Sequence, residues 1–190
     1  MSITSKRVRE KLRTLDYKIF WLINGRAHNK YVDYLIKLVN GIDAYFGNLS
    51  KLIILLLVIG FILWHSERDS FKADFLFVAA VLAINAFFGY VFKRFLKAGR
   101  PLSVFGEKVH VFSERLYKYS MPSYHTQIAF CLAALLSCRF HAYAFLFYVG
   151  ALLIGLYRVY VGSHFPSDVV MGAIMGFGIT KIMLKLFVTC

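Results

Sequence analysis

The sequence predicts an all-α protein: a polytopic membrane bundle of five, or alternatively six, transmembrane helices with amphipathic interfacial helices at its N-terminus. Hydrophobic residues make up 59% of the 190 residues, and the mean hydropathy is +0.61, whereas soluble domains are about 45–50% apolar. The apolar residues also gather in long runs that carry few charges, as membrane-spanning helices do. Because no Ser/Gly-rich linker divides the chain, we expect one integral-membrane domain over residues 1–190.

The N-terminal region, residues 1–48, is amphipathic rather than continuously apolar. Leu12, Leu15, Ile19 and Leu22 repeat at helical spacing among basic residues, which predicts a helix lying on the membrane surface. The segment from Asp16 to Asn48 carries many polar residues. We interpret it as two interfacial or short helices, with a sixth crossing as the alternative.

Residues 49–190 form the helical core, in which five apolar runs predict spanning helices. Asp74 and Asn85 interrupt the second run and are candidates for hydrogen bonds between helices. Gly172 and Gly176 form a GxxxG motif in the fifth run, and small residues at this spacing let two helices approach closely. The five runs are Leu49–Trp64, Phe71–Phe92, Pro122–Cys138, His141–Val161 and Pro166–Phe187.

Polar residues suited to binding a phosphate lie next to the ends of these runs. If the second to fifth spans alternate in direction, the end of the second, the start of the third, the end of the fourth and the start of the fifth share one membrane face. Three polar segments occupy these places, so we expect them to meet. They are Lys93 with Arg100-Pro101, Pro122-Ser123 with His125, and Arg158 with His164 and Asp168.

The third segment combines an arginine, a histidine and an aspartate. An arginine inside an apolar helix is costly without a partner, and the planar guanidinium of Arg158 suits a phosphate; a salt bridge to Asp168 or Asp74 is the alternative. His164 and Asp168 are four residues apart, near a helix start that Pro166 favours. Asp168 can accept a hydrogen bond from one ring nitrogen of His164, which leaves the other nitrogen free to attack phosphorus.

The other two segments supply a proton donor and cations. Pro122 marks a helix start, where backbone N–H groups can bind an anion; Ser123 adds a hydroxyl, and His125 can protonate a leaving oxygen. An ordinary capped helix start is the alternative. Lys93 and Arg100 are seven residues apart, so both face one side if the helix continues between them. Taken alone, this cluster also suits a stop-transfer signal.

The formal net charge of +13 is consistent with a protein that contacts a membrane. In a soluble protein it would suggest nucleic acid. Here the cations lie at the ends of apolar runs, so we expect anionic lipid headgroups and the bilayer as partners, with neither nucleic acid nor an obligate protein partner. Anchoring by Lys and Arg also explains some of these charges. The loop from Leu102 to Tyr119 is a candidate binding segment for a lipid headgroup. The alternative is that it is a solvated basic loop.

The order Lys-x6-Arg-Pro, Pro-Ser-x-His and Arg-x5-His-x3-Asp, over residues 93–168, resembles the type 2 phosphatidic acid phosphatase superfamily. The resemblance implies a helical membrane core and a phosphohistidine intermediate, with no metal and no other cofactor; the sequence also offers no carboxylate cage for magnesium. His164 would be the nucleophile, Asp168 would orient it, and His125 would be the general acid. The residues implied to hold the phosphate oxygens are Lys93, Arg100, Ser123 and Arg158.

Two positions depart from the family pattern. Tyr124 stands where the family often has Gly between Ser and His, and Tyr157 stands where it often has Ser before the arginine. The backbone N–H of Tyr124 can still donate to a phosphate, so we keep it among the phosphate-binding residues. Both tyrosines bear on substrate preference.

The resemblance implies a membrane phosphatase that hydrolyses a phosphomonoester or pyrophosphate of a lipid. The candidate substrates are undecaprenyl pyrophosphate, phosphatidylglycerophosphate and lipid A 1-phosphate. A lipid phosphotransferase, or a non-catalytic lipid-phosphate binding or transport protein, is the alternative. The resemblance also implies the bacterial inner membrane with the active site on the periplasmic face, whereas a count of flanking Lys and Arg residues favours the cytoplasmic face.

Overall fold

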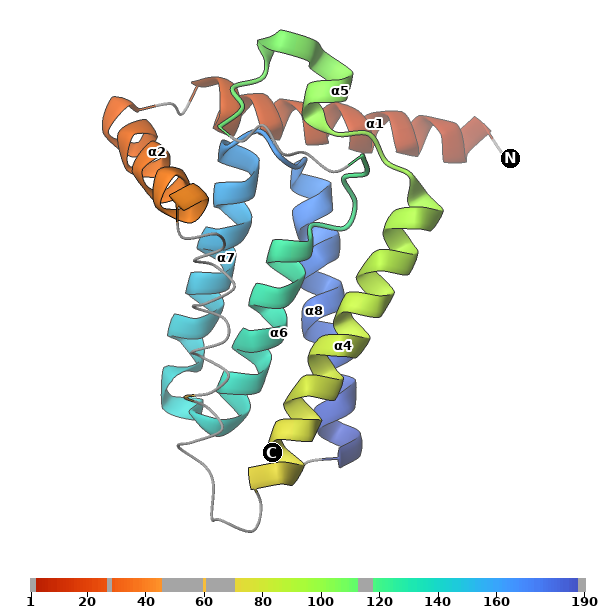
Figure 1. The fold of residues 1–190 in the computed structure, drawn as a ribbon. Helices are drawn as coiled ribbons and strands as arrows, with labels where there is room; N and C mark the ends of the chain where they lie inside the picture. The colour runs from red at the N-terminus through yellow and green to blue at the C-terminus, as the bar shows by residue number, and fades with distance from the viewer. Residues whose placement is uncertain (1–2, 27–28, 46–59, 61–70, 113–117, 188–190) are drawn as a thin grey trace.

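The computed structural model describes residues 3–26, 29–45, 60, 71–112 and 118–187, which form helices joined by loops (Figure 1). The all-α fold class is confirmed, since these residues contain no β-strand. Short 3-10 turns precede α7 and follow α5. In chain order the longer elements are α1 (Ile3–Phe20), a π-helical turn (Trp21–Arg26), α2 (Lys30–Tyr45), α4 (Phe71–Leu96), α5 (Pro101–Phe105), α6 (Tyr124–Arg139), α7 (Ala144–Tyr160) and α8 (Pro166–Phe187).

Helix α6 lies at the centre of a bundle that it forms with α4, α7 and α8. Apolar and small residues lie on all sides of α6, and most of its side chains are buried. This is expected of a helix that other helices enclose. The outer helices instead expose large apolar side chains, among them Phe87, Phe145 and Ile174. Exposed apolar surface of this extent marks a membrane-facing surface.

Four of the five predicted spans correspond to α4, α6, α7 and α8, with ends that differ by a few residues. The first predicted span, Leu49–Trp64, lies outside the described residues. Helix α6 has 16 residues, about 24 Å of helix, and its neighbours enclose it. Within the described part of the chain, three segments are long and apolar enough to cross a membrane: Ala73–Lys108, His141–Tyr160 and Pro166–Phe187.

The N-terminal region forms the predicted amphipathic helix, α1, followed by the shorter α2. Helix α1 lies across one end of the bundle, next to α5 (Figure 1). Its apolar stripe points away from the protein, since Leu12 and Leu15 are 61% and 54% exposed. This orientation suits a helix whose apolar face enters the membrane interface.

The GxxxG motif of α8 brings that helix against α6. A Cβ atom at Gly172 would lie 2.5 Å from the backbone oxygen of Ser123, and one at Gly176 would lie even closer to the backbone oxygen of Gln127. Only a residue without a side chain allows this approach. The predicted packing role of the two glycines is therefore confirmed.

A buried polar network joins α4 to α6 and α8 further along the bundle. The side-chain nitrogen of Asn85 donates to the backbone oxygen of Val81 at 3.0 Å and to the hydroxyl of Thr180 at 3.3 Å, and Gln127 Nε2 donates to the backbone oxygen of Asn85 at 2.7 Å. In lipid, such hydrogen bonds hold helices in register. The prediction of an interhelical hydrogen bond at Asn85 is confirmed.

We predict that Gly176→Ala destabilises the bundle, because its methyl group would collide with the backbone of α6. Overpacking of this kind costs about 1–3 kcal/mol, so the midpoint of thermal unfolding in detergent should fall. Gly178→Ala is the matched control, since a Cβ atom there meets nothing within 4 Å. Equal unfolding midpoints for the two variants would show that the approach of α6 and α8 can relax.

Candidate active site

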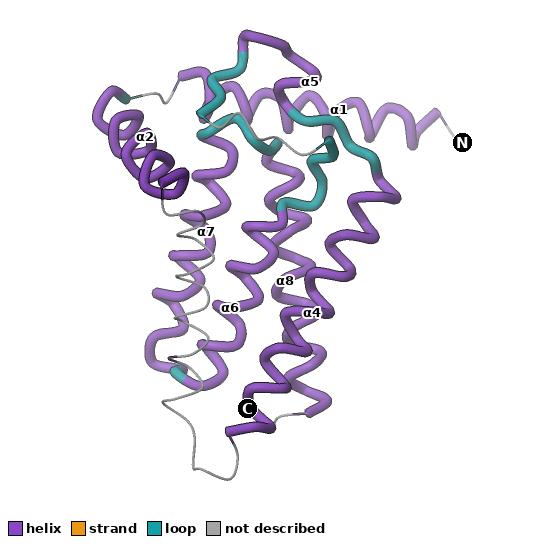
Figure 2. Tube along the Cα trace, viewed as in Figure 1, coloured by secondary structure: helices purple, strands orange, loops and turns teal. Residues whose placement is uncertain are grey.

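The four helix ends that the sequence predicts to share one membrane face do lie together. The end of α4, the start of α6, the end of α7 and the start of α8 meet at the end of the bundle that α1 and α5 cover (Figure 1). Most of the described loop residues gather at this same end (Figure 2). The topology therefore brings the three polar segments into one region.

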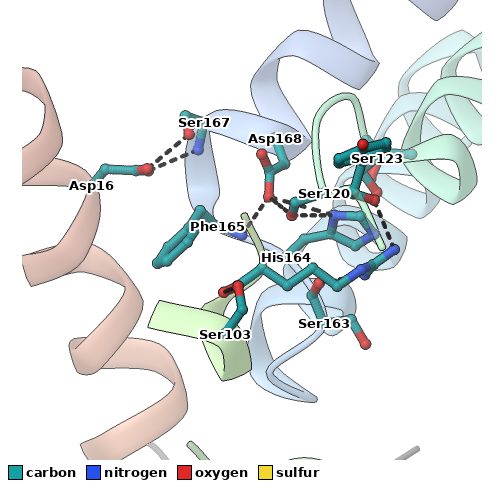
Figure 3. A network of polar contacts seen from close by, with 12 residues as sticks. Asp16, Ser103, Ser120, Ser123, Ser163, His164, Phe165, Ser167 and Asp168 are labelled. Atoms are coloured by element: carbon teal, nitrogen blue, oxygen red, sulfur yellow. Dashed lines mark hydrogen bonds and ion pairs between the residues drawn. The ribbon is translucent and has the colours of Figure 1, made fainter. Parts of the chain in front are cut away.

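His164 and Asp168 form the expected pair at the start of α8. Nδ1 of His164 lies 3.5 Å from Oδ2 of Asp168, and the two side chains are 2% and 3% exposed. The hydroxyl of Ser120 lies between them: it donates to Asp168 Oδ2 and is 3.3 Å from His164 Nδ1 (Figure 3). Both Asp168 and Ser120 therefore lie on the Nδ1 side of the ring, and a proton on Nδ1 would leave the lone pair of Nε2 free.

Ser120 is a site residue that the sequence analysis missed. It is fully buried, and its backbone N–H donates to the oxygen of Ala98 at 2.9 Å. In sequence it stands two residues before Pro122, where a serine is typical of an ordinary turn. Its proximity to the motif was the only available signal, because nothing in the local pattern indicates that its hydroxyl reaches Asp168.

Backbone hydrogen bonds hold the His–Asp turn in place. The N–H of Phe165 donates to Asp168 Oδ2 at 2.8 Å, and the N–H of Ser123 donates to the backbone oxygen of Asp168 at 2.9 Å. The second bond connects the start of α6 to the first turn of α8. It forms where Gly172 lets the two helices approach.

Arg100 reaches the site by a different path from the one predicted. Helix α4 ends at Leu96, and Lys97 has a left-handed backbone with φ of 47°, so Lys93 and Arg100 do not lie on one continuous helix. Arg100 precedes α5, and its guanidinium donates to the backbone oxygens of Ser163 at 2.7 Å and Tyr119 at 3.1 Å. It thereby ties together the loops that carry His164 and Ser120.

Lys93 and Arg158 complete a positively charged surround. Lys93, at the end of α4, is close enough to Arg100, Arg158 and Asp168 to interact electrostatically with each. Nε of Arg158 is buried with no hydrogen-bond partner. Within the described part of the chain Arg158 pairs with neither Asp168 nor Asp74, so the alternative of a structural salt bridge is not realised there. An unpaired guanidinium N–H in such a place is suited to an incoming anion.

The second segment brings His125 to the same region. His125 interacts electrostatically with four residues of the other segments: Lys93, Arg100, Arg158 and His164. Ser123 is the N-cap residue of α6, and its Oγ accepts a hydrogen bond from the hydroxyl of Thr126 at 3.0 Å. The proton of Ser123 Oγ therefore remains available for donation to a ligand. Tyr124 occupies the first position of α6 and is 43% exposed.

The environment of His164 keeps its imidazole neutral. Burial lowers the pKa of His164 to about 4, and the charges of Arg100 and Arg158 act in the same direction, while the hydrogen bond and charge of Asp168 oppose them. A neutral imidazole is the nucleophilic form. Among the described residues, no cluster of three His, Cys, Asp or Glu side chains is arranged to hold a metal ion.

A model of the PAP2 superfamily matches residues 74–190, more than half of the chain and all three polar segments. The chain belongs to the PAP2 superfamily. The structure resembles that of LpxE from Aquifex aeolicus, with 29% identity over 90% of this chain and 95% of that one and a TM-score of 0.66. It shares its fold with a PAP2-type phosphatidylglycerolphosphate phosphatase from Bacillus subtilis, with 20% identity over 91% and 94% of the two chains and a TM-score of 0.58. No curated protein matches the chain significantly.

Membership of the PAP2 superfamily confirms the resemblance inferred from the motifs. With its membrane-spanning helices, this PAP2 protein is a multi-pass membrane enzyme of the lipid phosphatase class. The motif residues come from several helix ends that the fold brings together. The sequence and the arrangement of the helices therefore both support the lipid phosphatase class.

We predict that the imidazole of His164 titrates near pH 4 in the ligand-free protein, well below the ordinary value of about 6.5. Between these two pH values the unfolded chain binds the proton more readily than the folded protein, so the contribution of His164 to stability is lost as the pH falls through this window. NMR of histidines labelled with ¹³C at Cε1 would measure the midpoint, and His164→Asn would assign the signal. A midpoint near 6.5 would contradict the effect of burial.

Proposed function

We propose that this PAP2 protein hydrolyses a phosphomonoester or pyrophosphate of a membrane lipid through a phosphohistidine on His164, without a metal ion. The observation that supports it best is the meeting of a buried His–Asp pair with arginines from two other segments. The guanidinium of Arg100 is tied to the loop before His164, and Nε of Arg158 has no partner. Phosphoryl transfer depends mainly on such charge neutralisation and positioning.

In the first step, Nε2 of His164 attacks phosphorus, and the bond from phosphorus to the lipid oxygen breaks. His125 gives its proton to the leaving oxygen. The imidazole ring gains positive charge as the N–P bond forms, and the Asp168 carboxylate, with Ser120 between, stabilises that charge from the Nδ1 side. Lys93, Arg100, Ser123, Arg158 and the N–H of Tyr124 would hold the phosphate oxygens.

In the second step, water replaces the lipid oxygen opposite His164. His125, now neutral, takes a proton from this water as its oxygen bonds to phosphorus, and the N–P bond breaks. The products are inorganic phosphate and the dephosphorylated lipid, or the lipid monophosphate if the substrate is a pyrophosphate. The enzyme returns to its starting protonation state.

The candidate substrates are lipid A 1-phosphate, undecaprenyl pyrophosphate and phosphatidylglycerophosphate. The likeness to LpxE, a lipid A 1-phosphatase, makes the first of these the substrate to test first. We propose that Tyr124 affects the choice, because it precedes His125 in the first turn of α6 and is exposed. We further propose a location in the bacterial inner membrane with the active site on the periplasmic face.

We predict that His164→Asn abolishes phosphate release in the presence of a chelator while leaving the thermal unfolding midpoint within a few degrees of the parent. Asparagine is polar, as histidine is, but it lacks the attacking nitrogen. The rate of phosphate release should therefore fall by several orders of magnitude. Phosphate release by detergent-purified protein on the three candidate lipids would measure it. A fully active variant would refute the assigned nucleophile, and an activity that the chelator abolishes and magnesium restores would refute the metal-free mechanism.

We predict that His125→Ala impairs phosphomonoester hydrolysis more than pyrophosphate hydrolysis. A lipid alkoxide needs a proton to leave, which is worth about 10²–10⁴ in rate, whereas a lipid phosphate is already a good leaving group. The ratio of kcat values of parent and variant, measured on phosphatidylglycerophosphate and on undecaprenyl pyrophosphate, tests this difference. Equal losses on both lipids would argue against a general acid at this position.

A further inference from the structure

Helix α1 contacts the catalytic turn, residues 164–168, through an acidic side chain. Asp16 accepts two hydrogen bonds from Ser167: its Oδ1 from the backbone N–H at 2.8 Å, and its Oδ2 from the hydroxyl at 2.7 Å (Figure 3). The two residues are 151 positions apart in the chain. Ser167 immediately precedes Asp168, the residue that orients His164 in the proposed mechanism.

Asp16 accepts a hydrogen bond from a backbone N–H of α8 that has no acceptor within that helix. The first N–H groups of a helix have no partner inside the helix. At the start of α8, the N–H groups of Asp168 and Val169 donate to the backbone oxygen of Phe165 at 3.0 and 3.3 Å, but that of Ser167 donates to Asp16. A carboxylate is also favoured at this end of a helix by the helix dipole.

Two aromatic residues of α1 contact the same turn. The rings of Tyr17 and Phe20 lie 5.2 and 5.3 Å from the ring of Phe165, measured between centroids. Phe165 follows His164 directly, and its N–H donates to Asp168 Oδ2. Helix α1 thus touches the turn at Phe165 and at Ser167, on either side of Pro166.

The face of α1 that meets the bundle is the less apolar one. Asp16 and Phe20 lie four residues apart on this face, and Phe20 is fully buried, as is Asn24 in the π-helical turn that follows α1. Leu12 and Leu15 point outward. Burial raises the pKa of Asp16, although its hydrogen bonds to Ser167 oppose the rise. Holding a partly buried carboxylate against α8 is costly, and a helix that only anchored the chain would not need it.

We propose that α1 is a strap over the catalytic turn, with Asp16 as its positioning residue. The turn is held from inside by Asp168, through Ser120 and Phe165, and from outside by Asp16. Without Asp16, the first turn of α8 is free to shift, and His164 moves relative to the phosphate. A misplacement of about 1 Å at the reacting atoms can cost 10²-fold in rate. The kinetic part of this proposal rests on the proposed function.

The test compares three full-length variants purified in detergent. Asp16→Ala removes both contacts. Asp16→Asn keeps them, because its oxygen accepts from the N–H of Ser167 and its NH₂ donates to the Ser167 hydroxyl. Glu10→Ala is the control: Glu10 is an exposed acid on the same helix, so it changes the charge without touching α8.

The first readout is kinetic, on whichever of lipid A 1-phosphate, undecaprenyl pyrophosphate and phosphatidylglycerophosphate the parent hydrolyses. We expect Asp16→Ala to lower kcat by about 10–100-fold with KM within about threefold, and Asp16→Asn and Glu10→Ala to stay within about threefold of the parent in both. A parent-like kcat for Asp16→Ala, or an equal loss in Asp16→Asn, would overturn the positioning role.

The second readout is hydrogen exchange by mass spectrometry on peptides covering residues 164–170, which requires no activity. Asp16→Ala should speed exchange in this turn about tenfold or more, while α6 and the remainder of α8 exchange as in the parent. Unchanged exchange in the turn, or faster exchange throughout the bundle, would refute the proposal that α1 holds the catalytic turn. If the parent releases no phosphate from any of the lipids, the proposed function fails, and hydrogen exchange alone still decides whether α1 holds the turn.

Discussion

The arrangement of the site depends on how one carboxylate, that of Asp168, is held inside the protein. Its Oδ2 receives the hydroxyl of Ser120 and the N–H of Phe165 and lies beside His164, and its backbone oxygen receives the N–H of Ser123. A buried charge without such donors costs several kcal/mol. The carboxylate donors come from the loop before α6 and the turn before α8, and the donor to the backbone oxygen of Asp168 comes from the start of α6. Bonding both groups of Asp168 therefore fixes where these segments meet.

The hydrogen bond to the backbone oxygen of Asp168 also requires α6 and α8 to pack closely. Ser123 can reach the backbone of Asp168 only if the start of α6 lies against the first turns of α8, and Gly172 leaves the space for that contact. Further along the bundle, Asn85 of α4 bonds to Thr180 of α8 and accepts from Gln127 of α6, so α4 holds both helices in register. The GxxxG motif and the polar network deep in the bundle therefore set the distance between Ser123 and Asp168 at its end.

Hydrophobic runs predicted four helices of the core, because the length and apolar character of a spanning helix are imposed by the bilayer. Motif spacing likewise predicted that His164 and Asp168 would pair. Other features depend on the path of the loops: the chain leaves the helix at Lys97, so Arg100 reaches the site from α5. The role of Ser120 follows from a tertiary contact that no local pattern encodes.

The contacts of α1 show a further limit of pattern reading. Its leucines predicted an apolar face at the membrane surface, and Leu12 and Leu15 do point away from the protein. The leucine pattern did not indicate that Asp16 on the opposite face would bind Ser167, nor that Asn24, in the π-helical turn after α1, would donate to the backbone oxygens of His110 and Tyr160. Which face is buried is decided by the hydrogen-bond donors and acceptors of the loops beneath, and these become known only with the fold.

The charges around His164 suit the two stages of the proposed reaction in opposite ways. Before a phosphate binds, burial and the charges of Arg100 and Arg158 hold the pKa of His164 at about 4, so the nucleophile is neutral. A bound phosphate would offset those cations, and the N–P bond would place positive charge on the ring, where Asp168 and Ser120 already lie against Nδ1. In the proposed reaction, the cations would keep the attacking nitrogen unprotonated and bind the phosphate oxygens, while the carboxylate would stabilise the ring once it has reacted. Both effects need the same short distances, which is why the turn from His164 to Asp168 must be held rigidly.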